Sequence, residues 1–197
     1  ETGMALIVKI DKVTTTYKTI WDDGPIVRIN LKDDQVLNPV QFSHSGYHAR
    51  FSPNGDKFAF LQRDNLIAYV ADLNGNILTQ FTYYNKNTPV WGSNPFGAKA
   101  LSWTDKGIYI FGSGRVALFN ETGALIDSFT ITDATGKIAG YGGRVASKAD
   151  WAVTEEDDLL INMATKKSMG KLAGDGCGWG ISPDGTHITQ NRWDTFA

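Results

Sequence analysis

Three histidines are the side chains of this sequence best suited to metal binding or to acid-base chemistry near neutral pH. His44 and His48 are four residues apart, a spacing that would place two imidazoles on one face of a helix as a metal pair, and His187 lies far along the chain. Here the pair falls in a loop and an entering strand, where a polar position beside Tyr47 is the favoured interpretation. We therefore predict no metal site and no cofactor.

Nucleophilic chemistry finds equally little support. Cys177 is the one cysteine, and neither a histidine nor a second cysteine lies near it in the sequence, so a small buried residue is the favoured interpretation. The sequence contains no Gly-x-Ser-x-Gly or His-Glu-x-x-His motif. The segment Gly112-Ser113-Gly114-Arg115 is typical of a hairpin turn rather than of a phosphate-binding loop. These enzyme classes are disfavoured.

Carboxylates cluster in short runs that could serve acid-base chemistry or bind calcium: Asp22-Asp23, Asp33-Asp34 and Glu155-Glu156-Asp157-Asp158. Each run lies at an expected turn between strands, so we expect solvated turn charges. The segment Asp72-Leu73-Asn74-Gly75-Asn76 is likewise expected to be a turn. No catalytic residue is predicted, and the sequence favours a non-enzyme without deciding the question.

Aromatic side chains fall into two groups by their position. One group alternates within expected strands and is predicted to pack in the core: Phe51, Phe58, Phe60, Trp103 and Trp151. The other group lies in connections together with polar residues that could orient a sugar or a peptide, and these are the candidate ligand-binding residues: Tyr84, Trp91, Asn94, Tyr141, Arg192, Trp193 and Asp194. The long connection Tyr83 to Gly97 is the best single candidate for a binding loop, and the alternative is that it folds over itself to cover a sheet edge.

Composition places the chain among ordinary globular proteins. Of 197 residues, 42% are hydrophobic and 20% charged, while 6 Trp and 21 Gly favour strands and tight turns. The formal net charge is -2 and no basic run occurs, which argues against nucleic acid as a partner. The longest apolar stretches are strand-sized, so no membrane insertion is expected.

Two short motifs bear on the location of the protein. Glu1-Thr2-Gly3 before Met4 is typical of the residues that a secretion vector leaves after signal cleavage, so we assign residues 1–3 to an expression-vector scar and residues 4–197 to the domain. Asn120-Glu121-Thr122 is a sequon for N-glycosylation. A secreted or periplasmic glycoprotein is therefore expected, with Asn120 as the glycosylation site.

Short strands recur in sets of four along the chain. The first set is expected at 49–51, 57–61, 66–71 and 77–81, the second at 98–103, 108–111, 115–119 and 124–129, and the third at 143–147, 151–154, 158–162 and 168–172. A fourth set begins at 178–181 and 187–191 and stops two strands short. Aligning the serines at the first turns, Ser52, Ser102, Ser147 and Ser182, gives spacings of 50, 45 and 35 residues, near the period of about 40 to 50 residues of a four-stranded propeller blade.

These observations predict an all-β fold, a β-propeller of four-stranded antiparallel blades with about four blades in this chain. Further strands are expected at 5–10, 14–21, 25–30 and 36–42, and two of them could complete the final repeat and hide its edges. Otherwise the chain would be part of a larger propeller.

Two turns carry a family resemblance: Phe51-Ser52-Pro53-Asn54-Gly55-Asp56-Lys57-Phe58-Ala59-Phe60 and Ile181-Ser182-Pro183-Asp184-Gly185-Thr186-His187-Ile188. Both resemble the Ser-Pro-Asp-Gly repeat of the TolB-like propellers. The repeats at Ser102 and Ser147 lack the proline. The resemblance implies that the loops entering first strands and the links between second and third strands emerge on one face, where ligands bind.

Three functions remain open. The first is a non-enzymatic extracellular binding or scaffolding propeller that recognises a glycan or protein partner through the face carrying Trp91, Tyr141 and Trp193. The second is the propeller part of a polysaccharide- or peptide-active enzyme. The third is a structural protein that forms a homo-oligomer by pairing exposed strand edges. Fold alone does not choose among them.

Overall fold

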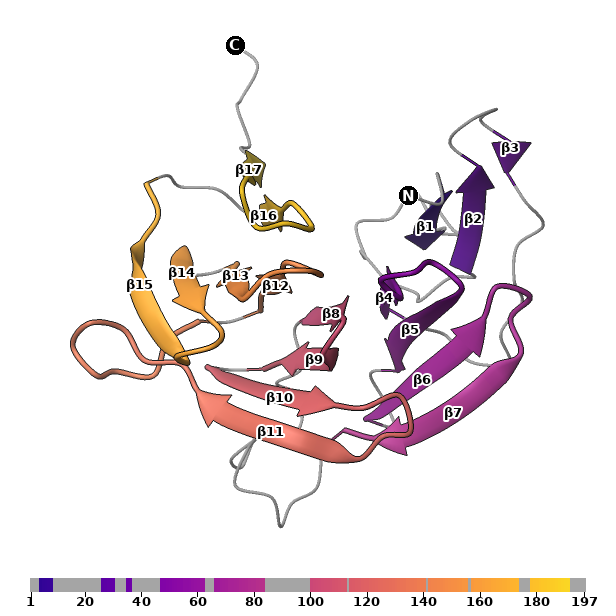
Figure 1. Ribbon diagram of the computed structural model, residues 1–197, viewed down its shortest axis with the longest axis horizontal. Coiled ribbons are helices and arrows are strands. Elements are labelled where there is room, and N and C mark those ends of the chain that lie inside the picture. The colour runs from indigo at the N-terminus through magenta and orange to yellow at the C-terminus, as the bar shows by residue number, and fades with distance from the viewer. Residues whose placement is uncertain are drawn as a thin grey trace, which may run out of the picture. The chain divides into compact units, whose positions relative to one another are not determined.

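The computed structural model describes residues 4–8, 26–30, 35–36, 47–62, 66–83, 100–112, 114–140, 142–155, 157–173 and 178–191. Every regular element within these ranges is a strand, and the described part of the chain holds no helix with the length and apolar character of a membrane span. The chain divides into two compact units, Glu1–Thr82 and Tyr83–Ala197 (Figure 1).

The first unit contains two antiparallel sheets. One has three strands, in the order β1 (Met4–Val8), β2 (Ile26–Asn30) and β3 (Gln35–Val36), and the other has four, in the order β4 (Tyr47–Phe51), β5 (Lys57–Gln62), β6 (Ile67–Asp72) and β7 (Ile77–Thr82). Strands at both ends of the N-terminal segment are thus confirmed, whereas the strand expected at 14–21 lies outside the described residues. The strands β1 to β3 pair with one another in a sheet within the first unit, and the completion of the final repeat by N-terminal strands stays a prediction.

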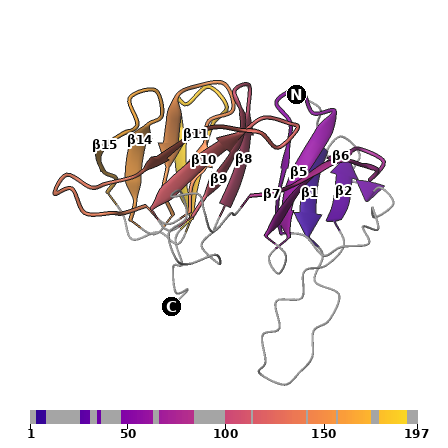
Figure 2. The same ribbon diagram turned by 90° about the horizontal axis from the view of Figure 1, so that it is seen from below.

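The second unit contains three sheets. The first is β8 (Ala100–Thr104), β9 (Gly107–Phe111), β10 (Arg115–Phe119) and β11 (Leu125–Thr130), and the second is β12 (Arg144–Val145), β13 (Trp151–Val153), β14 (Leu159–Asn162) and β15 (Lys167–Lys171). The third has two strands, β16 (Gly178–Ile181) and β17 (Ile188–Asn191). In each sheet the strands follow chain order, which can be followed from β8 to β11 in Figure 2. The first strand β12 contacts both β8 and β16. The expected four-strand repeats are confirmed.

Burial decreases from the first strands of each four-stranded sheet to the last. All residues of β8 and β9 are buried, as are four of the five in β10, whereas no residue of β11 is. The same difference separates β5 and β6 from β7, and β13 from β15. Strands covered on both faces are encoded by near-continuous apolar runs such as Gly107–Phe111, and exposed outer strands by mixed sequences.

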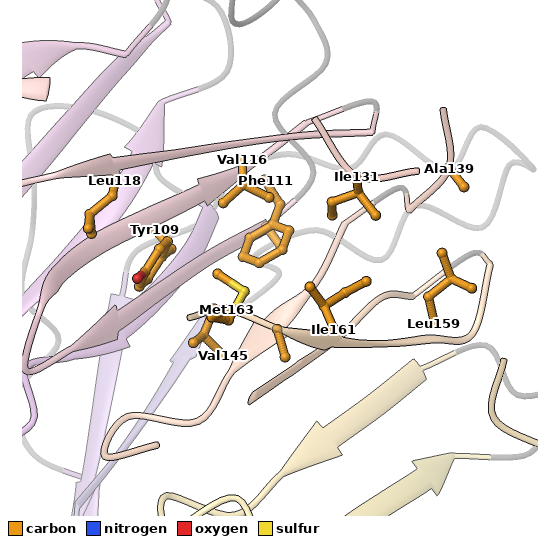
Figure 3. Packing of buried hydrophobic residues seen from close by; sticks show 12 residues of the cluster. Tyr109, Phe111, Val116, Leu118, Ile131, Ala139, Val145, Leu159, Ile161 and Met163 are labelled. Atoms are coloured by element: carbon orange, nitrogen blue, oxygen red, sulfur yellow. The ribbon is translucent and has the colours of Figure 1, made fainter. Parts of the chain in front are cut away.

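The core of the second unit lies between its two four-stranded sheets. Tyr109, Phe111 and Val116 from one sheet face side chains from the other, among them Ile161 and Leu159, which are 0% and 5% exposed (Figure 3). Burying such side chains stabilises the fold by roughly 1.5 to 3 kcal/mol each. In the first unit Phe58, Phe60 and Tyr69 pack in a corresponding cluster, with ring centroids 6.0 and 5.0 Å apart in succession. Phe58, Phe60 and Trp103 are thus core residues as predicted.

The first turns confirm the Ser-Pro-Asn/Asp-Gly geometry in the two repeats that carry it. Ser52 N donates to Lys57 O at 2.9 Å and Ser182 N donates to His187 O at 2.9 Å, and the glycines that follow have φ of 75° and 72°. Ala146 N makes the same bond to Trp151 O, 2.9 Å long. Ala146 is therefore the counterpart of Ser52 in the third repeat.

The serine alignment is consequently wrong in the second and third repeats. Ser147 lies one residue beyond the counterpart of Ser52. In the second repeat the strand pair Trp103 and Ile108 takes the place of Phe51 and Phe58, and it encloses a turn two residues shorter. Ser102 instead lies within β8, where its hydroxyl accepts a hydrogen bond from Val145 N of the next sheet at 3.0 Å.

Three further turns are Asx turns, each stabilised by hydrogen bonds from its backbone to its first side chain. The first residue of each, Asp72, Asn120 or Asp133, accepts hydrogen bonds through Oδ1 from the backbone nitrogens two and four residues later, at 2.8 to 3.0 Å. A glycine with φ between 84° and 91° follows three residues after it. Asp and Asn favour this arrangement because their short side chains can bond to their own backbone. The expected turn at Asp72-Leu73-Asn74-Gly75-Asn76 is confirmed.

Candidate ligand-binding site

A pocket of about 510 Å³ lies between the sheet β12–β15 and the two-stranded sheet β16–β17. Arg144 opens β12, Glu155 follows β13, and the remaining lining residues belong to β16 and β17: Gly178, Trp179, Gly180, Thr189 and Gln190. The pocket therefore lies at the end of the unit where first strands begin and second strands end. This is the end at which the resemblance to propellers predicted ligand binding.

Arg144 is the cation of the pocket. Its Nη2 lies 3.1 Å from Glu155 Oε1, and each of the two side chains keeps 25% of its surface exposed. Burial lowers the pKa of Arg144 below its usual value and the Glu155 carboxylate opposes that shift, so the guanidinium stays charged. Its second terminal nitrogen, Nη1, is buried and donates no hydrogen bond within the described residues. A buried donor of this kind is stabilised when a ligand or a water supplies an acceptor.

Trp179 forms the apolar wall, and a buried carboxylate fixes its orientation. The indole Nε1 donates to Asp158 Oδ1 at 2.7 Å, while Lys171 Nζ lies 3.6 Å from the other carboxylate oxygen. Asp158 has φ of 54°, in the left-handed region that Asp tolerates better than most residues, and its side chain is 9% exposed. The indole ring is therefore held in one orientation beside the arginine.

The loop that enters β12 is fastened to the same group of acidic residues. Gly140 N donates to Asp157 Oδ2 at 2.5 Å. A Cβ on Gly142 would lie 2.9 Å from Glu155 Oε2, and both glycines have positive φ. Side chains at these two positions would be strained, and the missing Cβ of Gly142 lets the backbone pass close to Glu155. The loop is positioned against the pocket by the carboxylates of residues 155 to 158.

This finding corrects the expectation for that carboxylate run. Glu155, Asp157 and Asp158 were predicted to be solvated turn charges, yet each is bonded to another part of the fold. The sequence alone does not show this, because the bonding partners Arg144, Gly140 and Trp179 come from other turns and strands.

The two-stranded sheet is attached to its neighbour at both ends. The Trp179–Asp158 hydrogen bond joins them beside the pocket, and Lys148 N donates to Pro183 O at 2.8 Å at the opposite turns. A Cβ on Gly185 would lie 3.0 Å from both Ala149 and Trp151, which shows how closely the turns pack. These contacts place Trp151 against the turn of the next sheet. The sequence predicted Trp151 to be a core residue, and the structure shows it partly buried.

A second, smaller pocket lies at the opposite end of the unit. It measures about 170 Å³ and lies between the turn at Thr104–Lys106 and the turn at Ser147–Asp150, and Tyr109 is among its lining residues. Lys106 and Asp150 form an ion pair across it. Burial raises the pKa of Tyr109, with smaller contributions from Asp150 and Asp127. The ion pair is exposed, and such pairs contribute little stability.

All seven candidate ligand-binding residues, Tyr84, Trp91, Asn94, Tyr141, Arg192, Trp193 and Asp194, lie outside the described residues. Four of them adjoin the pocket in sequence. Tyr141 stands between Gly140 and Gly142, and 192–194 follow β17, whose Gln190 lines the pocket. Of the long connection after β7, Tyr83 is described, and it is buried with 3% exposed surface.

The other predicted sites have plain structural roles where they are described. Asn120 begins one of the Asx turns, and its Oδ1 also accepts from the Thr122 hydroxyl at 2.8 Å. His187 Nδ1 lies 2.7 Å from the Thr186 hydroxyl. His48 lies in β4, whereas His44 and Cys177 are outside the described residues. Gly112 N bonds to Arg115 O at 2.9 Å, as expected for a hairpin turn.

Sequence reasoning missed Arg144, Glu155 and Trp179 as site residues. In the sequence, Arg144 is an ordinary polar residue at the start of an expected strand, and Trp179 is one of several aromatic residues in expected strands. The glycines on both sides of Trp179 were the available signal, because glycine within a strand often marks a place where another group approaches the backbone closely.

Comparisons with known proteins support the fold. No family model and no curated protein matches the chain. Among solved structures it is similar to the β-propeller domain of Cps50 (Swd1) from Myceliophteria thermophila, with a TM-score of 0.54 and 15% identity over 84% of this chain. It is also similar to dihydro-heme d1 dehydrogenase NirN in complex with DHE, with a TM-score of 0.52 and 14% identity over 85% of this chain. The chain spans 55% and 37% of those two structures.

Proposed function

We propose that this β-propeller chain is a non-enzymatic binding module that takes its ligand, a glycan or a segment of a protein partner, in the pocket of Arg144 and Trp179. The observation that carries the proposal is the buried Nη1 of Arg144, which donates no hydrogen bond within the described residues although Nη2 is held by Glu155. A ligand oxygen would satisfy this donor, and the pocket gives it room.

The pocket chemistry suits a polar ligand with an apolar face. Trp179 supplies a ring held by Asp158, and Thr189 and Gln190 supply polar groups on the opposite strand. Arg144 and Glu155 together carry no net charge, so the pocket favours hydroxyl or amide groups over a free ion. Sugars and peptide backbones both present such groups beside apolar surface.

Residues next to the pocket in sequence extend this proposal. The candidate residues Tyr141, Arg192, Trp193 and Asp194 stay part of this proposal, because each directly neighbours or closely follows in sequence a residue that lines or shapes the pocket. Trp91, Tyr84 and Asn94 would add a second group of contacts from the connection after β7. The partner is thus bound by one end of the propeller.

Three finer assignments belong to the same proposal. The TolB-like resemblance gains support from the third repeat, which lacks the proline but repeats the bond of Ser52 and Ser182 at Ala146. We place the protein outside the cytoplasm, in the extracellular space or periplasm. We also assign Asn120 as a glycan acceptor, since it lies in a hairpin turn whose neighbours are exposed.

The test is a screen of the purified chain against a neutral oligosaccharide array and a peptide array, with hits measured by calorimetry. Arg144→Lys keeps the charge and loses the planar pair of donors, so it is expected to weaken binding by about 10 to 100-fold, equivalent to the roughly 1.5 to 3 kcal/mol of a charged hydrogen bond. Arg115→Lys is the matched control, because Arg115 also opens a strand and is partly buried but lies outside the pocket.

Binding that Arg144→Lys and Arg115→Lys leave equally unchanged would contradict the proposal, provided that both variants keep the far-UV circular dichroism of the parent. So would a folded protein that binds nothing on either array. A hit on the oligosaccharide array alone or on the peptide array alone would decide between the two ligand classes.

A further inference from the structure

The turn between β6 and β7 contains an Asn-Gly pair, Asn74 and Gly75. The amide carbon of an asparagine side chain is attached to Cβ, so the backbone nitrogen of the following residue can reach it and close a succinimide ring. A glycine in the following position has no Cβ to hinder this approach. The pair therefore has the composition of a site that modifies itself.

The side-chain amide of Asn74 is accessible. Asn74 is exposed, its backbone nitrogen donates to Asp72 Oδ1 at 2.9 Å, and no described residue forms a hydrogen bond with its amide group. Asn76 in the same turn differs, because its Nδ2 donates to Asp72 Oδ2 at 2.8 Å. The amide of Asn74 can therefore rotate toward the nitrogen of Gly75 without first breaking such a bond.

The attacking nitrogen is also close to solvent. Gly75 is partly exposed, and its nitrogen donates to Asp72 O at 3.1 Å. In the other Asn-Gly pair of the sequence, at Asn54, the glycine is buried and its nitrogen donates to Ser52 O at 2.9 Å. Local opening of a turn exposes its backbone nitrogens to water and hydroxide. Of the two pairs, the one at Asn74 is therefore the more reactive in the folded protein.

We infer that Asn74 deamidates spontaneously in the folded protein, with the nitrogen of Gly75 as the nucleophile, and that the product loosens this turn. The Gly75 nitrogen loses its proton to hydroxide and forms a bond to Cγ of Asn74. The bond from Cγ to Nδ2 breaks, and Nδ2 takes a proton from water and leaves as ammonia. Water then opens the succinimide ring at either carbonyl, which gives aspartate or isoaspartate. The reaction consumes water and needs no oxidant or reductant.

Deamidation changes both the charge and the backbone of the turn. Hydrogen bonding, above all from the Asn76 side chain, lowers the pKa of Asp72 below its usual value, so a new carboxylate at position 74 faces a like charge. Isoaspartate also adds a main-chain carbon before Gly75, which displaces the nitrogens of Gly75 and Asn76 from their acceptors on Asp72. The inference is independent of the ligand pocket at Arg144.

Peptide mapping by mass spectrometry tests the inference on the folded protein, incubated at neutral and at mildly alkaline pH in heavy-oxygen water. The peptide with Asn74 should exchange its amide for a carboxylate that contains solvent oxygen, and faster at the higher pH. Conversion at Asn74 should be about tenfold or more faster than at Asn120, because Asn120 precedes Glu121 and glycine alone leaves the attacking nitrogen unhindered. Conversion at Asn54 should be slower than at Asn74.

Asn74→Ser is the matched variant, because it removes the amide and keeps the backbone nitrogen that donates to Asp72. Urea titration should give the aged parent a lower free energy of unfolding than the fresh parent, while aged Asn74→Ser keeps its fresh value. Conversion at Asn74 in the urea-denatured chain but not in the folded protein overturns the inference. Equal rates at Asn74 and Asn120 in the folded protein, or equal losses of stability in the aged parent and aged Asn74→Ser, overturn it as well.

Discussion

Replacing Trp179 by Phe should destabilise the second unit, because it removes the donor that pairs with a buried carboxylate. Asp158 Oδ1 accepts the indole N–H at 2.7 Å, and the Asp158 side chain is 9% exposed. A hydrogen bond to a charged group contributes about 1.5 to 3 kcal/mol, and an unsatisfied buried acceptor adds a desolvation penalty. Lys171, 3.6 Å from Oδ2, would offset part of that penalty. We expect a loss of about 2 to 3 kcal/mol in the free energy of unfolding.

A double-mutant cycle separates the hydrogen bond from the change in side-chain size. Asp158→Gly removes the carboxylate while keeping a residue that accepts the positive φ of this position. The free energy of unfolding is measured for the parent, Trp179→Phe, Asp158→Gly and the double variant, by urea titration followed by far-UV circular dichroism. A coupling energy of about 1.5 to 3 kcal/mol is expected.

Trp103→Phe is the matched control. Trp103 is 5% exposed, close to the 9% of Trp179, but its indole donates no hydrogen bond to another described residue. It should therefore show the effect of reduced size without the effect of a lost donor. A coupling energy below about 0.5 kcal/mol between positions 158 and 179 would refute the reasoning, as would equal losses for Trp179→Phe and Trp103→Phe.

Two further predictions concern the turns. Asn120→Asp should leave the free energy of unfolding nearly unchanged, since Asp occupies this position in the turns at Asp72 and Asp133. Asn120→Ala should lower the free energy of unfolding by about 1 kcal/mol. Equal free energies of unfolding for the two variants, measured by urea titration, would contradict this role of the Asn120 side chain. The Ser182 hydroxyl, followed by the backbone and hydroxyl of Thr186, lowers the pKa of Asp184 to about 2. Its folded-state pKa lies below the ordinary 3.8, so its stabilising contribution is present above pH 3.8 and is lost as the pH falls toward 2. Asp184→Asn should flatten this part of the curve of stability against pH, and an unchanged acid limb would count against the assignment.

The strands were predictable because each is short, apolar and bounded by turn residues whose chemistry is local. Ser52-Pro53-Asn54-Gly55 determines its own backbone, and the structure repeats that geometry at Ser182. The alignment failed at Ser102 and Ser147 because the second turn is two residues shorter and the third uses Ala146 where the first and fourth have serine. Neither difference leaves a sign in composition or period.

The site was less predictable because its contacts join distant segments. Loop aromatics were selected as ligand-binding residues since aromatics in loops are visible in a sequence. Arg144 became a candidate only through its pairing with Glu155 and its buried Nη1. Trp179 became one through Asp158, a residue twenty-one positions earlier in the chain. Long-range hydrogen bonds of this kind are set by the packing of sheets, which a single sequence does not report.

Within the described residues the sheet of β16 and β17 has no central strand, since each of its two strands has one hydrogen-bonded neighbour there. Its amide protons can exchange with solvent once the bonds from Trp179 and Lys148 to the adjoining sheet open, while β12 to β15 stay folded. The same two strands supply five of the seven residues that line the pocket at Arg144. Partial unfolding at low free energy would therefore admit a ligand too large for the closed pocket, and a bound ligand would slow hydrogen exchange in this sheet more than elsewhere.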